Sequence, residues 1–240
     1  MAQEKSNEIL AIFIFGSVWG LFQSVLTAGM VKFSVIPLFF EHLHTCPCPL
    51  AAVLIGIPIM GTVFAVHKKP SMLLGIGLVA SLFSFLVIPF LSVPAFSESI
   101  TTYPIVNPAL ANLFASLVLC LMLSLTLRRE KVGTPLVAGI GGLAMFLSSS
   151  IWIFTVVSIG APILGPSMLS SPLAYILRVS PIWGALSVLT LPIGYLLGPR
   201  VQSRVQRWSR ANPLPHKMAW ILLFSACWIA SLAIAPLIAT

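Results

Sequence analysis

The sequence predicts an all-α fold, a polytopic bundle of about seven transmembrane helices that forms one integral membrane domain over residues 1–240. Hydrophobic residues make up 58% of the chain and charged residues only 8%, a balance well outside that of a soluble domain. Apolar runs of about 20 residues, the length that crosses roughly 30 Å of hydrocarbon, recur along the chain. A soluble fold is therefore excluded, and the lipid bilayer is the expected environment.

Charges and prolines bound each apolar run and give its approximate limits. The second and sixth runs are short and contain Pro58 and Pro192, which a membrane helix tolerates where neighbouring groups satisfy the freed carbonyls. If the second run were re-entrant, six crossings would remain and both termini would lie on one side. The seven expected spans cover residues 9–29, 49–66, 71–93, 108–127, 135–159, 181–198 and 218–238.

Lysine and arginine are divided unequally between alternate loops. Of the 13 basic residues, Lys32 and Arg178 fall on one side of a seven-span arrangement and the rest on the other. Because cytoplasmic loops retain positive charge, we expect the N-terminus in the cytoplasm and the C-terminus outside, in the plasma membrane. The net charge of +8 is thus assigned to topology, and no nucleic-acid partner is expected.

Small residues recur four positions apart, a spacing that places both on one helix face and lets two helix backbones approach closely. Two interpretations stay open for such a face: tight packing inside the bundle, or docking of a partner subunit in the membrane. The pairs are Gly16/Gly20, Ala138/Gly142, Gly194/Gly198 and Ala226/Ala230.

The segment 199–217 is basic and amphipathic, and the pattern predicts a short interfacial helix. Its apolar face carries Val201, Val205 and Trp208. The segment either contacts anionic lipid headgroups or offers a contact surface to a cytoplasmic partner. Arginines follow the same helical spacing beside the apolar face at Arg200, Arg204 and Arg207.

Acidic residues are scarce, and this limits the chemistry available to the chain. It contains no aspartate, and all five glutamates lie outside the expected spans. Proton and cation carriers usually keep a carboxylate within the bilayer, so a pump or antiporter is disfavoured. A Ser/His/Asp triad is excluded as well. Catalysis stays an open question, with a non-enzyme favoured.

The densest group of metal-binding residue types lies between the first two spans, on the predicted outer side. Imidazole and thiolate suit zinc, copper, nickel or cobalt, while a carboxylate supplies an oxygen ligand or orients a histidine. The alternatives are a disulfide to another cysteine and an exposed loop without metal. The candidate ligands are His42, His44, Cys46, Cys48 and Glu41.

A second candidate site consists of polar and aromatic residues in the middle or outer part of the spans. Polar groups are costly in lipid, so we expect them to face the bundle interior. There they either join helices together or line an outward-opening pocket for a substrate. The candidate substrate-binding residues are Trp19, Gln23, Asn112, Ser149, Trp152 and Tyr175.

Three short motifs give the chain a resemblance to a known family. They are Gly-Ser-Val-Trp-Gly-Leu at 16–21, Gly-Ile-Pro-Ile-Met at 56–60 and Ile-Trp-Gly at 182–184. Together with the general layout, they resemble the substrate-capture subunits of energy-coupling-factor transporters. The resemblance implies a bundle that captures a vitamin or metal ion from outside and docks, through small residues of its first helix, onto a transmembrane partner driven by ATPases.

Two hypotheses for function follow. The first is a transport-related subunit that captures a small solute or metal ion from the outer side and depends on partner subunits for energy, because the chain shows no nucleotide site and no buried charge for coupling. The second is a non-catalytic membrane anchor in a multisubunit complex, redox complexes included. An enzyme that uses the His/Cys loop as a metal or redox site is a third reading with less support.

Overall fold

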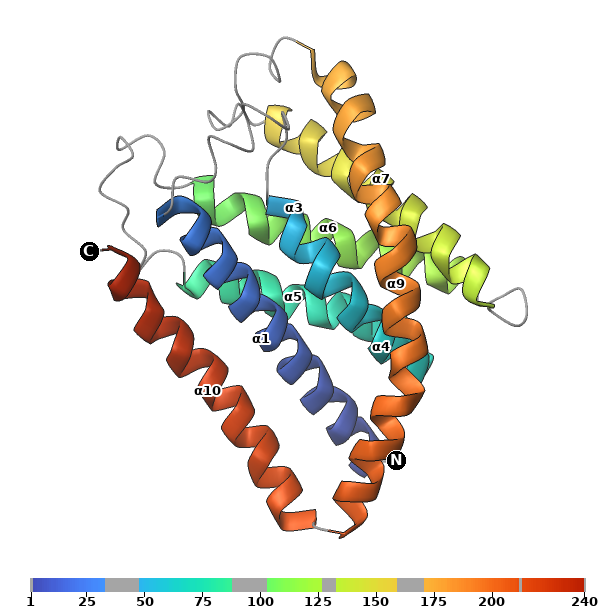
Figure 1. Ribbon diagram of the computed structural model, residues 1–240, viewed down its shortest axis with the longest axis vertical. Helices are drawn as coiled ribbons and strands as arrows, with labels where there is room; N and C mark the ends of the chain where they lie inside the picture. Colours follow the sequence, from blue (N-terminus) through green and yellow to red (C-terminus); the bar gives the residue numbers. More distant parts are fainter. Residues whose placement is uncertain are drawn as a thin grey trace.

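The computed structural model describes the backbone of residues 2–32, 48–87, 103–126, 133–158, 171–211 and 213–239. Almost every residue in these ranges is helical, and none of them lies in a strand. The predicted all-α bundle is therefore confirmed, with its helices packed side by side as Figure 1 shows.

Seven helical rods make up the described ranges, and each overlaps one expected span. The second rod joins three elements end to end: α3, the π-helix η2 and α4. In chain order the elements are α1 (Ala2–Lys32), α3 (Cys48–Ala51), η2 (Ala52–Gly56), α4 (Ile57–His67), α5 (Ser71–Val87), α6 (Tyr103–Thr126), α7 (Thr134–Ser158), α9 (Pro172–Ala211) and α10 (Pro213–Ala239).

Six of these rods are long and apolar enough to cross a membrane. The run for which we considered a re-entrant path is one of the six, Pro49–His67, whereas α5 contributes the shorter apolar stretch Ser71–Phe83. An integral membrane protein is thus the reading that length and composition support.

Successive rods alternate in direction and give the bundle two distinct ends (Figure 1). At one end α1 begins and α4 turns into α5, and there Lys69 forms an ion pair with Glu8. We call this the basic end. At the opposite end α1, α5 and α7 finish, and α3, α6 and α9 begin. The alternation is the arrangement that the charge distribution requires.

The π-helix η2 interrupts the second rod just before Pro58. In η2 the Ile57 backbone N–H donates to the Ala52 carbonyl, five residues back. Pro58 has no N–H, so a carbonyl in the preceding turn loses its donor, and a wider turn accommodates that loss. Pro192 lies inside α9, which continues through it.

The expected boundary between a sixth span at 181–198 and a separate interfacial helix at 199–217 is wrong in its details. α9 is a single helix of 40 residues that continues to Ala211, and residues 213–217 already belong to α10. Pro199 sits within α9 without ending it. Helical structure in 199–211 was predicted correctly, but the segment is the last part of a long oblique helix.

The small-residue face of the first helix is used inside the bundle. A Cβ added at Gly16 would lie 2.7 Å from Val79 Cγ1, and one at Gly20 would lie 2.7 Å from Phe83 Cγ, both on α5. Glycine is thus required there for close approach of two helices. The Gly16/Gly20 face is therefore covered by α5.

The pair Gly194/Gly198 serves the same purpose between α9 and α4. A Cβ at Gly194 would lie 2.7 Å from Pro58 Cα, and one at Gly198 would lie 2.7 Å from the Ala65 Cβ. Thr62 Oγ1 donates to the Gly194 carbonyl at 3.1 Å. A Cβ at Gly142 would likewise meet Val188 of α9. Three of the four small-residue pairs thus involve internal packing, and on the fourth Ala226 is exposed.

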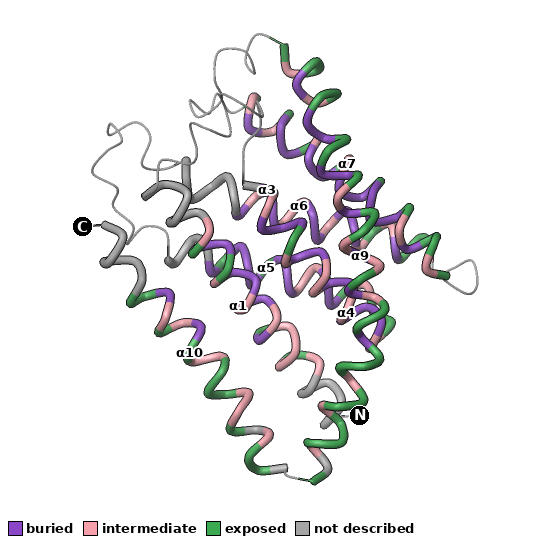
Figure 2. The backbone as a smooth tube through the Cα atoms, viewed as in Figure 1, coloured by how far each residue is buried: buried purple, intermediate pink, exposed green. Residues whose placement is uncertain are grey.

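Burial is greatest where the second rod, α6 and α7 meet, whereas α10 and the end of α9 are largely exposed (Figure 2). A single cluster of buried apolar residues links α1 to α9 through η2, α4, α5, α6 and α7. Leucine and isoleucine side chains point outward from α9 and α10, as expected for helices that face lipid.

The last helix joins the bundle through an aromatic seam on α1 and α5. Trp228 Nε1 donates to Ser17 Oγ at 3.1 Å, and the Trp228 ring lies 4.6 Å from that of Phe83, centroid to centroid. Phe13 and Phe224 make an edge contact at 6.3 Å. The seam fixes one face of α10 and leaves the other exposed.

Candidate polar site in the bundle core

All six candidate substrate-binding residues are buried, as the cost of polar groups in lipid requires. They come from four helices and lie in the half of the bundle away from the basic end. On α1 and α7, which finish at that far end, they lie in the second half of the helix, and on α6 and α9, which begin there, they lie in the first half. The residues are Trp19, Gln23, Asn112, Ser149, Trp152 and Tyr175.

Trp19 is seated directly against the π-helix. A Cβ added at Gly56 would lie 2.8 Å from Trp19 Nε1 and closer still to the carbons of the ring, so only glycine admits the indole at this position. The first and second family-like motifs therefore meet here, Trp19 coming from one and Gly56 from the other. This contact places an indole N–H of α1 beside η2.

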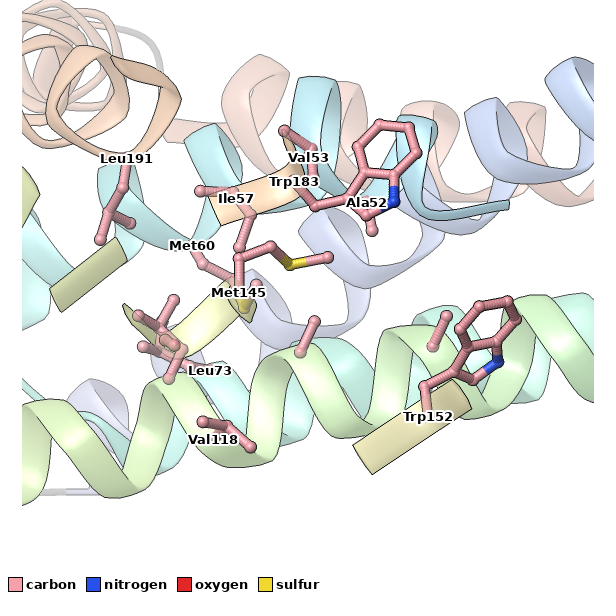
Figure 3. Packing of buried hydrophobic residues seen from close by; sticks show 14 of the residues in the cluster. Ala52, Val53, Ile57, Met60, Leu73, Val118, Met145, Trp152, Trp183 and Leu191 are labelled. Atoms are coloured by element: carbon pink, nitrogen blue, oxygen red, sulfur yellow. The ribbon is translucent and has the colours of Figure 1, made fainter. Parts of the chain in front are cut away.

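Trp183, from the third motif, belongs to the same core but was not among the candidate binding residues. Figure 3 shows the Trp183 ring close to Ala52 and Val53 of η2, and the Trp152 ring on the same side of Met145. The apolar side chains of Leu73, Val118 and Leu191 fill the part of the cluster toward the basic end. The spacing of Trp183 could have identified it. Trp183 lies four and eight residues after Val179 and Tyr175, so it shares their face of α9.

Several buried polar atoms of the bundle have no hydrogen-bond partner among the described residues. They are Trp19 Nε1, Trp152 Nε1, Trp183 Nε1, Ser187 Oγ, Thr190 Oγ1 and both polar atoms of the Asn112 amide. Each exposed fraction is low, at 0% for Trp19 and Asn112, 2% for Trp152 and 3% for Trp183. A buried donor without an acceptor costs about 1–3 kcal/mol, so the three indoles and the Asn112 amide, buried together in one half of the bundle, call for an explanation.

Ser149, Ser150 and the remaining two candidates differ from these groups because they have partners. Ser149 Oγ donates to the Phe146 carbonyl at 3.0 Å within its own helix, and Ser150 Oγ lies 3.1 Å from Ser180 Oγ, joining α7 to α9. Gln23 and Tyr175 each have an interaction partner in the protein. The alternative role as links within and between helices therefore fits Ser149 and its neighbours.

Four of the five candidate metal ligands, Glu41 to Cys46, lie outside the described residues, and Cys48 is described only as the first residue of α3. Within the ranges that the structure describes, no three His, Cys, Asp or Glu side chains come together as a metal site. The metal site stays a prediction for the loop alone.

The basic end carries a polar cluster that the sequence did not reveal. Lys68, in a left-handed conformation with φ 53°, ends α4. Its Nζ donates to Tyr195 Oη at 2.9 Å and lies 4.5 Å from the centre of that ring. With the ion pair of Lys69 and Glu8, these contacts tie the turn between α4 and α5 to both α1 and α9.

The described polar groups of the core offer hydrogen-bond donors. Three indole N–H donors and one amide are buried without a partner, and no charged side chain is buried among the described residues. Such a set favours an uncharged partner that accepts hydrogen bonds. No family model, curated protein or solved structure matches this chain.

Proposed function

We propose that this protein is a membrane transport subunit that captures a small uncharged solute in the half of its bundle away from the basic end. The observation that carries the proposal is the group of buried donors without partners: Trp19, Trp152 and Trp183, together with the Asn112 amide. A ligand with carbonyl or ring-nitrogen acceptors would satisfy them, and the indole rings would pack against its flat faces.

Orientation follows from the charge distribution. With the basic end in the cytoplasm, by the rule that positive loops stay inside, the donors lie toward the outer surface of the plasma membrane. The solute would then enter from outside. The His/Cys loop at 41–48, as a metal site, would add a second ligand.

Energy for transport would come from partner subunits. The described helices carry no ionisable carboxylate in their cores: Glu8, the glutamate whose side chain is described, pairs with Lys69 at the basic end. Ion-coupled carriers need a titratable or ion-binding group within the bilayer. The exposed apolar side of α10, which includes Ala226, is the remaining small-residue face on which such a partner could dock.

The rival proposal, a passive anchor of a multisubunit complex, drew support from four small-residue faces. Three of these are covered inside the bundle. An anchor also gives no reason for indole N–H groups to be buried without acceptors. The solute-capture proposal accounts for both observations.

Native mass spectrometry of the full chain, purified in mild detergent from its own membranes, tests the proposal. We expect a small-molecule mass that is released on unfolding. Trp152→Phe/Trp183→Phe keeps two aromatic rings but removes two donors, and should lose most of that mass. Trp220→Phe is the matched control, because Trp220 Nε1 donates to His216 Nε2 far from this core. A protein that carries no bound molecule, or a double variant that retains it fully, would contradict solute capture.

A further inference from the structure

The last part of α9, residues 199–211, forms a basic arm that extends beyond the packed bundle. In Figure 1 the arm and the start of α10 reach past the turn where α4 meets α5. Arg200, Arg204 and Arg207 are exposed. Val201 and Trp208 are 41% and 43% exposed, so the arm presents apolar and basic groups together.

Nothing acidic in this half of the chain balances the arm. Residues 131–240 contain no aspartate or glutamate, and the one ion pair among the described side chains joins Lys69 to Glu8. Arg207 Nε donates to the Ser203 carbonyl at 3.3 Å, which leaves the other guanidinium N–H groups available. Guanidinium groups bind phosphate oxygens through paired hydrogen bonds.

An aromatic stack joins the arm to the start of α10. The His216 ring lies 5.2 Å from the Trp208 ring and 5.7 Å from the Trp220 ring, and Trp220 Nε1 donates to His216 Nε2 at 2.7 Å. From its first turn, α10 exposes apolar side chains, among them Leu214 and Met218. The stack therefore holds Trp208 beside the start of an apolar helix, and tryptophan concentrates where such helices meet the membrane surface.

We propose that the basic arm binds anionic phospholipid headgroups of the leaflet at the basic end, with Arg200, Arg204 and Arg207 on phosphates and Trp208 at headgroup depth. An acidic protein would match the charge equally well. Lipid is favoured because the exposed apolar residues Val201 and Trp208 of the arm are joined, through His216, to the start of α10, where Leu214 and Met218 are exposed, and one bilayer can cover both. The proposal does not depend on solute capture.

Energy transfer from tryptophan to labelled lipid tests this in the full chain, reconstituted in vesicles that carry either dansyl-phosphatidylglycerol or dansyl-phosphatidylcholine. The difference between the unmodified protein and Trp208→Phe isolates the Trp208 signal. We expect transfer to phosphatidylglycerol to exceed transfer to phosphatidylcholine and to fall at high salt. Each arginine should contribute about fivefold to the preference, so R200Q/R204Q/R207Q should abolish it.

Arg178→Gln is the matched control, because Arg178 is an exposed arginine of the same helix at its other end, and it should keep the preference. Circular dichroism confirms that each variant retains its helices. Equal transfer to both lipids, a preference that survives the triple variant, or one that Arg178→Gln also removes would overturn the proposal. A Trp208 signal shielded from both lipids, with an acidic protein co-purifying through the three arginines, would assign the arm to a protein partner instead.

Discussion

Asn112 is a fully buried residue whose side-chain amide has no hydrogen-bond partner among the described residues at either of its polar atoms. Because the exposed fraction of the residue is 0%, water does not reach them either. An amide can form four hydrogen bonds in all. The helix backbone at this residue is closely packed, since the backbone carbonyl oxygen of Asn112 would lie 3.2 Å from a Cβ placed at Gly77. The unpaired amide therefore lowers the stability of the ligand-free protein, and a bound molecule that forms hydrogen bonds with it would remove this cost.

Asn112→Leu should accordingly raise the stability of the ligand-free protein by about 1–2 kcal/mol, because it removes unsatisfied buried groups at similar volume. The measurement is the thermal unfolding midpoint in detergent after removal of any bound molecule. Ser81→Ala is the opposite control: Ser81 Oγ is buried and lies 2.7 and 2.8 Å from the carbonyls of Gly77 and Ala109, so its loss should lower stability by roughly 0.6 kcal/mol. A lower midpoint for Asn112→Leu would show that the amide is satisfied without ligand.

At the scale of elements, α4 and α9 pack closely because a glycine of each helix lies against the backbone of the other. Gly61 faces the Leu191 carbonyl, and Gly194 faces the backbone of Pro58. Pro58 and Pro192 each remove a backbone donor in this region. Thr62, whose hydroxyl bonds the Gly194 carbonyl, adds a polar link across the same seam. Two proline-containing helices can thus pack closely because neither presents a bulky side chain there.

Gly194→Ala should be strongly destabilising, by about 1–3 kcal/mol, since its Cβ would overlap the backbone of Pro58, which cannot move like a flexible side chain. Gly139→Ala is the matched control: a Cβ there meets nothing within 4 Å, so the better helix propensity of alanine should leave stability unchanged or slightly higher. Thermal unfolding of both variants in one detergent decides the matter. Equal midpoints would mean that α4 and α9 are not closely packed.

For the whole molecule, the two ends differ in charge, and this should fix the orientation in the membrane. Gly133 and Ser203 are exposed on the basic side, and Ser171 is exposed where α9 begins at the opposite end. A variant without native cysteines, carrying a single cysteine at one of these positions, can be labelled in intact cells with an impermeant thiol reagent. We expect labelling at Ser171 and protection at Gly133 and Ser203. The reverse pattern would invert the molecule and direct the buried donors toward the cytoplasm.

The sequence alone was enough for the helical class and the number of rods, because hydrocarbon imposes a long apolar run on every crossing and that constraint is local. It also placed Trp19, Asn112 and Trp152 in the interior, since an exposed polar group in lipid is costly whatever the fold. Helix limits within 172–217 were less accurate. Three prolines in α9 suggested breaks, but neighbouring helices allow it to continue.

Tertiary structure decided how those elements are used. The spacing of Gly16 and Gly20 could not show whether their face packs on α5 inside the bundle or docks a partner, because both uses require the same small residues. Nor could it show that Trp19 meets Gly56 or that Trp183 joins them, since these residues are far apart in the chain. Whether a buried donor has an acceptor depends on the positions of several helices at once. Local composition thus determined that the chain is a membrane bundle, and long-range packing decided which buried polar groups have a hydrogen-bond partner among the described residues.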